Sequence, residues 1–336
     1  MIDKSAIERY LKSAKDKTIL VVGDLMIDEY ISGKVTRISP EAPVPVLEVR
    51  EEWSLPGGAA NVALNIQCLG ANAIIAGYVG EDRSGDELID MLKNANIDVS
   101  AVIRSEDVCT TVKTRLLTES QQIVRFDREK ILTGTNGCEA MLEQKILELI
   151  DDVDAIIIED YRKGTITASL IRYIVELAAQ KNIPVGLDPK DDKGLDFSGI
   201  TIAKPNFKEA CAAVGISEPT LKGSFDADVI LNEIGEKLLK KWQTEALLIS
   251  LGAMGMYLHP KDGKPILIPT KAKKVFDVSG AGDTVIATFM SALIGGASYE
   301  ESAHIANYAA GVVVGKLGTA SCCIDEIIEF EGYFYE

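Results

Sequence analysis

The chain has 336 residues, of which 47% are hydrophobic and 26% charged, a composition typical of globular rather than disordered or fibrous proteins. Its 35 Lys and Arg against 51 Asp and Glu give a net charge of −16, which excludes long-range attraction to nucleic acid or to an anionic membrane. The first ten residues alternate in charge, and the longest nearly uncharged stretches fall short of the roughly 20 residues that a membrane span needs, so we expect a cytoplasmic protein.

Short aliphatic segments alternate along the chain with segments whose hydrophobic residues recur at helical spacing. The predicted strands span residues 18–22, 73–79, 155–158, 184–187, 200–203 and 246–250. The predicted helices span residues 61–69, 85–94, 139–150, 168–180, 228–241, 284–293 and 302–314. This alternation predicts an α/β fold with three layers, in which helices cover both faces of a parallel sheet.

Two stretches, residues 30–50 and 109–126, interrupt this alternation. Both show hydrophobic residues with a period of two and no helix between their strands, which predicts a small half-exposed sheet that projects from the main domain. The residues alone leave two interpretations open. The sheet is either an edge hairpin or a lid that excludes water from a site of phosphate transfer.

The polar segment 21–28 directly follows the first predicted strand and carries Asp24 and Asp28. Open α/β sheets bind ligands at this edge, and carboxylates there suit sugar hydroxyls. The next motif, residues 56–61, offers the bare backbone of Gly57 and Gly58 and the amide of Asn61 ahead of a predicted helix. Taken alone, that motif favours a glycine turn followed by a helix start over a ligand contact.

The most specific motif, residues 277–285, leads directly into a hydrophobic helix. Gly280, Ala281 and Gly282 can present backbone N–H groups at the helix N-terminus, where the peptide dipoles favour an anion such as a phosphate. Asp283 follows in the first turn. It either caps the helix or accepts a proton from a hydroxyl that attacks the phosphoryl group, and the motif alone does not choose between these roles.

Metal chemistry based on zinc is disfavoured, because the chain has only His259 and His304 and no pair of cysteines at C-x-x-C spacing. We expect reduced thiols. The six cysteines are Cys68, Cys109, Cys138, Cys211, Cys322 and Cys323.

Five motifs together resemble, in their order along the chain, the ribokinase family of carbohydrate kinases. The resemblance covers nearly the whole chain and implies a Rossmann-like three-layer core with a small β-sheet lid. It implies one kinase domain over residues 1–336, with lid strands at about 30–50 and 109–126, and dependence on ATP and Mg²⁺. The motifs are Gly23-Asp-Leu-Met-Ile-Asp28, Pro56-Gly-Gly-Ala-Ala-Asn61, Lys204-Pro-Asn-Phe-Lys-Glu209, Ser250-Leu-Gly-Ala-Met-Gly255 and Gly280-Ala-Gly-Asp283.

Within that family, residues 36–46, 121–127 and 311–319 resemble the heptose-7-phosphate kinases of lipopolysaccharide precursor synthesis. That implies phosphorylation of D-glycero-β-D-manno-heptose 7-phosphate at the anomeric hydroxyl, which gives the 1,7-bisphosphate for ADP-heptose synthesis. Two alternatives stay open: a related kinase for another sugar or nucleoside, and a non-catalytic protein that binds a sugar phosphate. Relatives often carry a fused nucleotidyltransferase; we expect a kinase alone.

The resemblance also assigns roles to individual residues. It makes Asp283 the catalytic base and Gly280, Ala281 and Gly282 the anion hole. It places Asn206 and Glu209 at the side of the nucleotide phosphates and Mg²⁺, with contact through water allowed. The further nucleotide-binding residues are Ser250, Gly252, Gly255 and Asn307. The residues that match sugar contacts are Asp28, Gly57, Gly58 and Asn61.

The monovalent-cation site and the site of the acceptor's phosphate need separate treatment in this chain. Asp277 and Ser279 fit a monovalent-cation site, but the position of a third ligand carries Cys322, so potassium dependence is left open. In an acidic protein the acceptor's phosphate requires local cations, with Arg37 and Arg115 foremost. The full set of candidates is Arg37, Lys113, Arg115, Arg125, Lys163 and Lys190. Family members often form a homodimer through the lid, which covers exposed strand edges.

Overall fold

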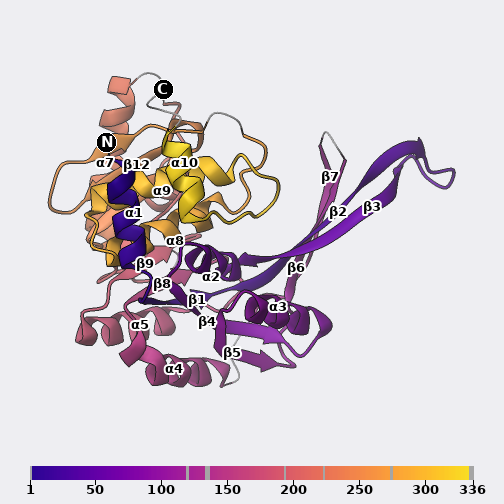
Figure 1. Cartoon of the computed structure of the whole chain (residues 1–336), viewed down its shortest axis with the longest axis horizontal. Coiled ribbons are helices and arrows are strands. Elements are labelled where there is room, and N and C mark those ends of the chain that lie inside the picture. The colour runs from indigo at the N-terminus through magenta and orange to yellow at the C-terminus, as the bar shows by residue number, and fades with distance from the viewer. Residues whose placement is uncertain are drawn as a thin grey trace.

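The computed structural model describes residues 2–118, 121–132, 137–192, 194–221, 224–272 and 275–332. In this part of the chain a nine-stranded sheet forms the centre of the molecule (Figure 1). Neighbouring strands are parallel from β5 to β11, and the last two strands pair antiparallel at one edge. The spatial order is β13 (Ile266–Ile268), β12 (Met256–Pro260), β11 (Ala246–Ser250), β10 (Ile202–Ala203), β9 (Val185–Asp188), β8 (Ala155–Glu159), β1 (Thr18–Gly23), β4 (Asn72–Gly80) and β5 (Asp98–Ser105).

Helices cover both faces of this sheet, which confirms the predicted three-layer α/β class. Successive residues of β1 alternate between the two layers: Ile19 and Val21 pack in one hydrophobic cluster, and Leu20 and Val22 in the other. The first cluster contains residues of α2 (Ala59–Cys68), α3 (Arg83–Asn94), α8 (Ala281–Ile294) and α9 (Tyr299–Val313). The second contains residues of α4 (Cys138–Leu149), α5 (Ala168–Lys181), α6 (Phe207–Ala213) and α7 (Ser224–Trp242).

Two terminal helices, α1 (Lys4–Ser13) and α10 (Ile324–Gly332), pack with the outer side of α9 in a third cluster. α1 begins where the side chain of Asp3 accepts a hydrogen bond from the backbone N–H of Ala6, and it buries Ile7 and Leu11, one helical turn apart. Among the described residues, no helix is both long and apolar enough to cross a membrane. All six cysteines are free thiols.

A second sheet of four strands projects from the body as an arm (Figure 1). Its order is β3 (Pro45–Gly58), β2 (Leu25–Ile38), β6 (Thr111–Leu117) and β7 (Gln122–Arg128). The two stretches with a period of two lie in this sheet, but β2 begins earlier than expected, with only Asp24 between it and the end of β1. The inner end of the arm is therefore joined directly to β1, which lies between β8 and β4 in the main sheet.

Candidate active site

The carboxyl ends of the central parallel strands bring polar residues together at one edge of the sheet. Gly23 at the end of β1 is in register with Glu159 at the end of β8, and Glu159 is in register with Asp188 at the end of β9. Lys204 directly follows β10. The chain leaves β1 toward β4 on one side and returns through β8 on the other, so this edge is the topological switch point at which open α/β sheets bind ligands.

The N-terminus of α8 lies against this edge and is built from glycines. Gly280 precedes the helix with a positive φ of 75°, and a Cβ there would lie 2.7 Å from the side-chain nitrogen of Asn61. A Cβ on Gly282 would lie 3.1 Å from Nζ of Lys204. The two glycines therefore let the backbone approach the strand ends closely, with the N–H groups of the first turn available to an anion.

Asp283, in the first turn of α8, is buried and bonds to side chains rather than to its own helix. Its Oδ2 accepts a hydrogen bond from Asn61 Nδ2 at 2.7 Å, and its Oδ1 accepts one from the hydroxyl of Tyr161 at 2.8 Å. No side chain caps the start of α8. The alternative that Asp283 serves only as a helix cap therefore loses its support.

Burial raises the pKa of Asp283 to about 6, although the hydrogen bonds from Asn61 and Tyr161 lower it. Because a carboxyl group with this pKa can accept a proton and release it near neutral pH, the side chain suits general-base chemistry. Asn61 is held in turn by Asn65, whose Nδ2 donates to Asn61 Oδ1 at 3.2 Å and whose Oδ1 accepts from Thr284 at 3.0 Å. This buried chain directs the amide nitrogen of Asn61 at Asp283.

Tyr161 is positioned by Asp24, one of the two carboxylates after the first strand that suit sugar hydroxyls by their position in the sequence. The carboxylate of Asp24 accepts backbone hydrogen bonds from Tyr161 at 2.8 Å, Lys163 at 3.0 Å and Thr165 at 3.1 Å. Both oxygens of Asp24 are thus occupied by the loop that follows β8, and the sugar role does not apply to it. Its function is to shape the loop so that the hydroxyl of Tyr161 reaches Asp283.

An acidic cluster lies beside Asp283. Glu159, Asp188 and Asp283 each place a carboxylate oxygen within 4.8 Å of the others, and Lys204 Nζ contacts Asp188 at 2.7 Å. Burial raises the pKa of Glu159 well above its usual range, and the neighbouring carboxylates raise it further. Its Oε2 is buried and has no hydrogen-bond partner among the described residues. Carboxylate oxygens are the donors that Mg²⁺ prefers, so these residues fit a magnesium ion.

The predicted magnesium-side residues Asn206 and Glu209 start α6 through a capping box. Asn206 Oδ1 accepts from the backbone N–H of Glu209 at 2.9 Å, and Glu209 Oε2 accepts from the backbone N–H of Asn206 at 2.8 Å. Glu209 Oε1 lies 3.1 Å from Nζ of Lys190. Each side chain therefore already has a structural partner, while both also line the cavity described next.

A cavity of about 600 Å³ extends from Asp283 between the strand ends and helices α8 and α9. Ser250 lies where β11 ends, and Gly252 and Gly255 have positive φ values of 57° and 101° in the tight turn to β12. Asn307 Nδ2 donates to the carbonyl of Pro269 at 2.8 Å. The structure brings all the predicted nucleotide residues to this cavity: Asn206, Glu209, Ser250, Gly252, Gly255 and Asn307.

A second cavity, of about 320 Å³, lies between the main body and the inner end of the arm. Asp28, Gly58 and Arg115 line it, and Arg115 forms a buried ion pair with Asp28. A Cβ on Gly57 would lie 2.4 Å from Oδ2 of Asp28, so Gly57 packs behind that carboxylate. The cavity also collects four further basic residues, Lys113, Arg125, Lys163 and Lys190.

Arg37 is one of the two basic residues placed foremost for the acceptor, and the structure does not bring it to this cavity. It is exposed near the far end of β2, where it pairs in register with Val46. Nine residues separate it from Asp28, which is about 30 Å of extended strand at 3.3 Å per residue. The sequence pattern did not indicate how long the arm is. Because the arm is long, Arg37 lies too far from the cavity of its own chain to contact a ligand there.

The predicted monovalent-cation residues lie in the segment before α8. Asp277 Oδ1 accepts from the backbone N–H of Ser279 at 2.9 Å, and its Oδ2 accepts from that of Gly318 at 3.1 Å. Cys322 is buried in the hydrophobic cluster of α9 and α10. Burial raises the pKa of its thiol, which keeps it protonated and makes it a poor cation ligand. A cation at Asp277 and Ser279 stays a prediction.

Comparison with known proteins places the chain in a family. The pfkB family of carbohydrate kinases matches residues 16–327. The bifunctional protein HldE of Geobacter metallireducens is 39% identical over 332 residues, covering 99% of this chain and 66% of that protein. HldE of Caulobacter vibrioides is 41% identical over 308 residues, covering 90% and 61%. The chain thus spans less than two thirds of the length of these curated relatives.

Solved structures share the fold. Phosphofructokinase-2 from Escherichia coli in complex with potassium superposes with a TM-score of 0.75 at 20% identity, covering 95% of this chain and 99% of that one. Arabidopsis thaliana ribokinase complexed with ribose and ATP gives 0.71 at 20% identity, covering 94% and 98%. The chain therefore belongs to the pfkB family of carbohydrate kinases and is an ATP-dependent sugar kinase, as its motifs predict.

Proposed function

We propose that this kinase transfers the γ-phosphoryl group of ATP to the anomeric hydroxyl of D-glycero-β-D-manno-heptose 7-phosphate, giving the 1,7-bisphosphate. The observation that carries the proposal is that Asp283 lines both cavities, the larger one with the predicted nucleotide residues and the smaller one with the basic residues. A nucleotide and a sugar phosphate bound in them would meet at this carboxylate. The likeness to HldE over the length of the chain supports the heptose as acceptor.

In this proposal Asp283 accepts the proton of the attacking hydroxyl while the backbone N–H groups of residues 280–282 stabilise charge on the transferring phosphoryl group. Asn61 keeps the carboxylate oriented through its 2.7 Å hydrogen bond. Glu159 and Asp188, with Asn206 and Glu209, would hold Mg²⁺, which when bound neutralises the phosphate oxygens. Lys204 keeps Asp188 in place through its 2.7 Å contact.

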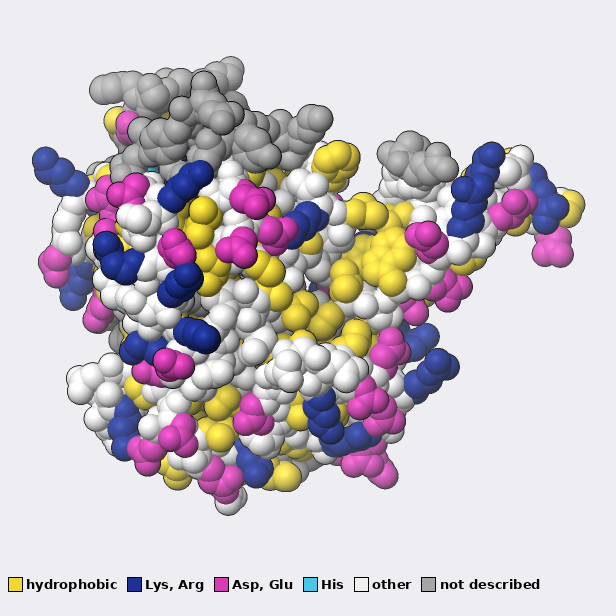
Figure 2. Space-filling model, in the orientation of Figure 1, with side chains coloured by type: hydrophobic (Ala, Val, Ile, Leu, Met, Phe, Trp, Pro, Cys, Tyr) yellow, Lys and Arg dark blue, Asp and Glu magenta, His cyan; other side chains and the backbone are white. Residues whose placement is uncertain are grey.

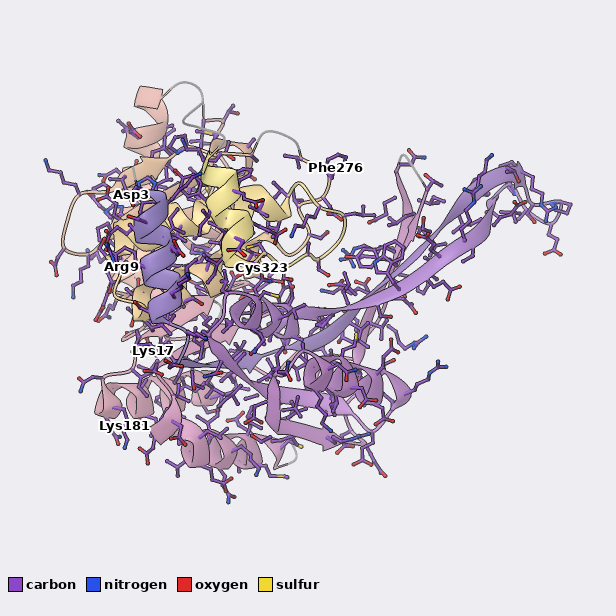
Figure 3. The ribbon with its side chains drawn as sticks, in the orientation of Figure 1. Asp3, Arg9, Lys17, Lys181, Phe276 and Cys323 are labelled. Atoms are coloured by element: carbon purple, nitrogen blue, oxygen red, sulfur yellow. The ribbon has the colours of Figure 1, made fainter. Side chains whose placement is uncertain are left out.

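The arm acts as a lid over the smaller cavity in this proposal. Its strands β2 and β6 supply Asp28, Lys113 and Arg115 to the cavity wall, so movement of the arm would open or close the acceptor site. Figure 3 shows Phe276, in the segment that leads into α8, projecting from the main body on the side of the arm. Phe276 is 72% exposed and Val278 68%, an apolar rim that a closed lid would cover.

We further infer that two copies associate through the arm. Its outer face carries Val124 and Phe126 of β7, each about half exposed, and Val49 of β3 is likewise 50% exposed. Figure 2 shows hydrophobic side chains gathered where the arm leaves the body. A second copy would cover this surface and the free edges of β3 and β7. Light scattering after size exclusion tests this, with a monomer at working concentration as the contrary result.

ADP release in the presence of Mg·ATP tests the proposed reaction across four acceptors: the heptose 7-phosphate, fructose 6-phosphate, fructose and ribose. We expect turnover with the heptose phosphate to exceed that with the others, and Asp283→Asn to lower it by about 10²–10⁴-fold, the usual contribution of general-base catalysis. Turnover of another sugar in its place would overturn the heptose assignment alone. Full activity of Asp283→Asn would overturn the role of the base.

A further inference from the structure

The acceptor cavity concentrates positive charge in a protein whose net charge is −16. Five basic side chains line it against three acidic ones. Arg115 of β6 and Arg125 of β7 are even direct cross-strand partners, and like charges in that relation destabilise a sheet. Such an arrangement is unfavourable for folding wherever a positive charge lacks a counter-ion.

Four of these five basic residues already have a carboxylate partner. The pairs are Arg115 with Asp28, Arg125 with Asp127 at 2.9 and 3.2 Å, Lys163 with Glu129 at 2.7 Å, and Lys190 with Glu209 at 3.1 Å. Their charges are therefore largely compensated within the protein.

Lys113 is the exception: within the described ranges its ammonium has no ion-pair partner. Asp28 and Asp127 are its cross-strand neighbours on either side. Their carboxylates, however, form ion pairs with Arg115 and Arg125 respectively. The ammonium lies over the ring of Tyr161, 4.8 Å from its centroid. Burial lowers the pKa of Lys113; the charges of Asp28 and Asp127 raise it, and those of Lys163 and Arg125 lower it.

We propose that Lys113, assisted by Arg125 and Lys163, binds the phosphate that the acceptor sugar already carries, and so makes the enzyme prefer phosphorylated sugars to free sugars. This rests on the proposed function as a sugar-phosphate kinase. An incoming phosphate would supply the one counter-ion that Lys113 lacks, through short charge-assisted hydrogen bonds.

The position of Tyr161 supports a cavity with two ends, one for the acceptor's phosphate and one for the reacting hydroxyl. Its ring face contacts Lys113, while its hydroxyl contacts the base Asp283 at 2.8 Å. One aromatic ring thus separates the proposed phosphate subsite from the reacting end. That spacing suits a sugar whose phosphate and attacking hydroxyl lie at opposite ends of the molecule.

The test compares kcat/KM for phosphorylated and unphosphorylated forms of one sugar, heptose 7-phosphate with heptose and fructose 6-phosphate with fructose. In Lys113→Met we expect kcat/KM to fall about 10- to 100-fold for the phosphorylated form and to change little for the free sugar. Lys113→Arg, which keeps the charge, should recover much of the preference. Lys34→Met removes an exposed charge of β2 in the same sheet and serves as the matched control.

The ratio between the two forms separates this proposal from general damage, because a loss of folding or of Tyr161 orientation lowers both rates equally. Inorganic phosphate should also inhibit the wild type competitively against the phosphorylated sugar, and weakly in Lys113→Met. An unchanged ratio in Lys113→Met would overturn the subsite. If the wild type prefers fructose 6-phosphate and Lys113→Met abolishes that preference, the heptose assignment is overturned. The role of Lys113 in binding the acceptor's phosphate is then supported.

Discussion

The hydroxyl of Tyr161 donates a hydrogen bond of 2.8 Å to Oδ1 of Asp283 across 122 residues of sequence. The other oxygen of Asp283 accepts from Asn61, so both oxygens of the carboxylate have a donor before any substrate arrives. Both bonds favour the ionised form and oppose the effect of burial on the pKa of Asp283. Tyr161 is therefore a positioning residue that tunes the basicity of Asp283.

Replacing Tyr161 by Phe removes one of these two donors while it keeps the ring between Lys113 and the base. The pKa of Asp283 should then rise, because burial is less well opposed, and the acid limb of kcat against pH should move upward by about one unit. One unit corresponds to about 1.4 kcal/mol, a usual strength for a hydrogen bond to a charged group.

A pH–rate profile of Tyr161→Phe beside the wild type measures this shift, and activity at pH 8 should stay within about tenfold of the wild type. Tyr299→Phe is a matched control, since Tyr299 donates to Glu245 on the surface. Coincident acid limbs for Tyr161→Phe and the wild type would show that the hydrogen bond does not tune the base.

The wild type should itself lose activity in mildly acidic solution. Asp283 has a pKa raised to about 6 and must be ionised to accept a proton, so its active form is lost as the pH falls through this value. We expect kcat/KM for the acceptor to fall about tenfold per pH unit below about pH 6 at saturating Mg·ATP. A rate that stays constant down to pH 5 would contradict the assignment.

Local patterns predicted most of the main domain. β1, β8 and β11 follow from aliphatic runs, because a strand covered on both faces is hydrophobic at every position. The edge pair β12 and β13 was not predicted, since two short antiparallel strands at a sheet edge lack that signature. The four-residue spacing of Ile7 and Leu11 could have indicated α1.

The residues missed at the site depend on contacts between distant segments. Tyr161 is defined by a loop that folds around Asp24, 137 residues earlier, and the local sequence carries no sign of that contact. Glu159 and Asp188 come together because their parallel strands are in register. An acidic residue just past each of two neighbouring predicted strands was the available signal, and it was not used. The motif at Gly280 was recognised because its geometry is local.

Glu159→Gln should remove part of a pH dependence of stability. In the folded state the pKa of Glu159 is raised well above its usual range, so between its unfolded and folded pKa the native protein binds a proton that the unfolded chain has released. The contribution of Glu159 to stability is therefore fully present below its unfolded pKa and is lost as the pH rises through this window. Without Mg²⁺, Glu159→Gln should be at least as stable as the wild type at pH 8.

Denaturant unfolding at pH 5, 6.5 and 8, with and without MgCl₂, measures this effect. Mg²⁺ should raise the midpoint of the wild type at pH 8 and should raise that of Glu159→Gln less, because one carboxylate of the cluster is gone. If the unfolding midpoints of the two proteins depend on pH in the same way and respond equally to Mg²⁺, then Glu159 neither has a raised pKa nor belongs to an ion site. Glu148→Gln, on the surface of α4, controls for the loss of charge alone.

Asp24→Asn tests whether the loop after β8 needs all three backbone hydrogen bonds. Asparagine can keep the oxygen that serves Tyr161 and Lys163, but its NH₂ group would then face the backbone N–H of Thr165, a donor against a donor in a buried site. A buried unsatisfied donor costs about 1–3 kcal/mol, so the free energy of unfolding should fall by this amount in denaturant melts. The acid limb should also shift as in Tyr161→Phe, because the displaced loop carries Tyr161 away from Asp283. Loss of stability without any shift of the limb would mean that Asp24 supports the fold but does not position Tyr161.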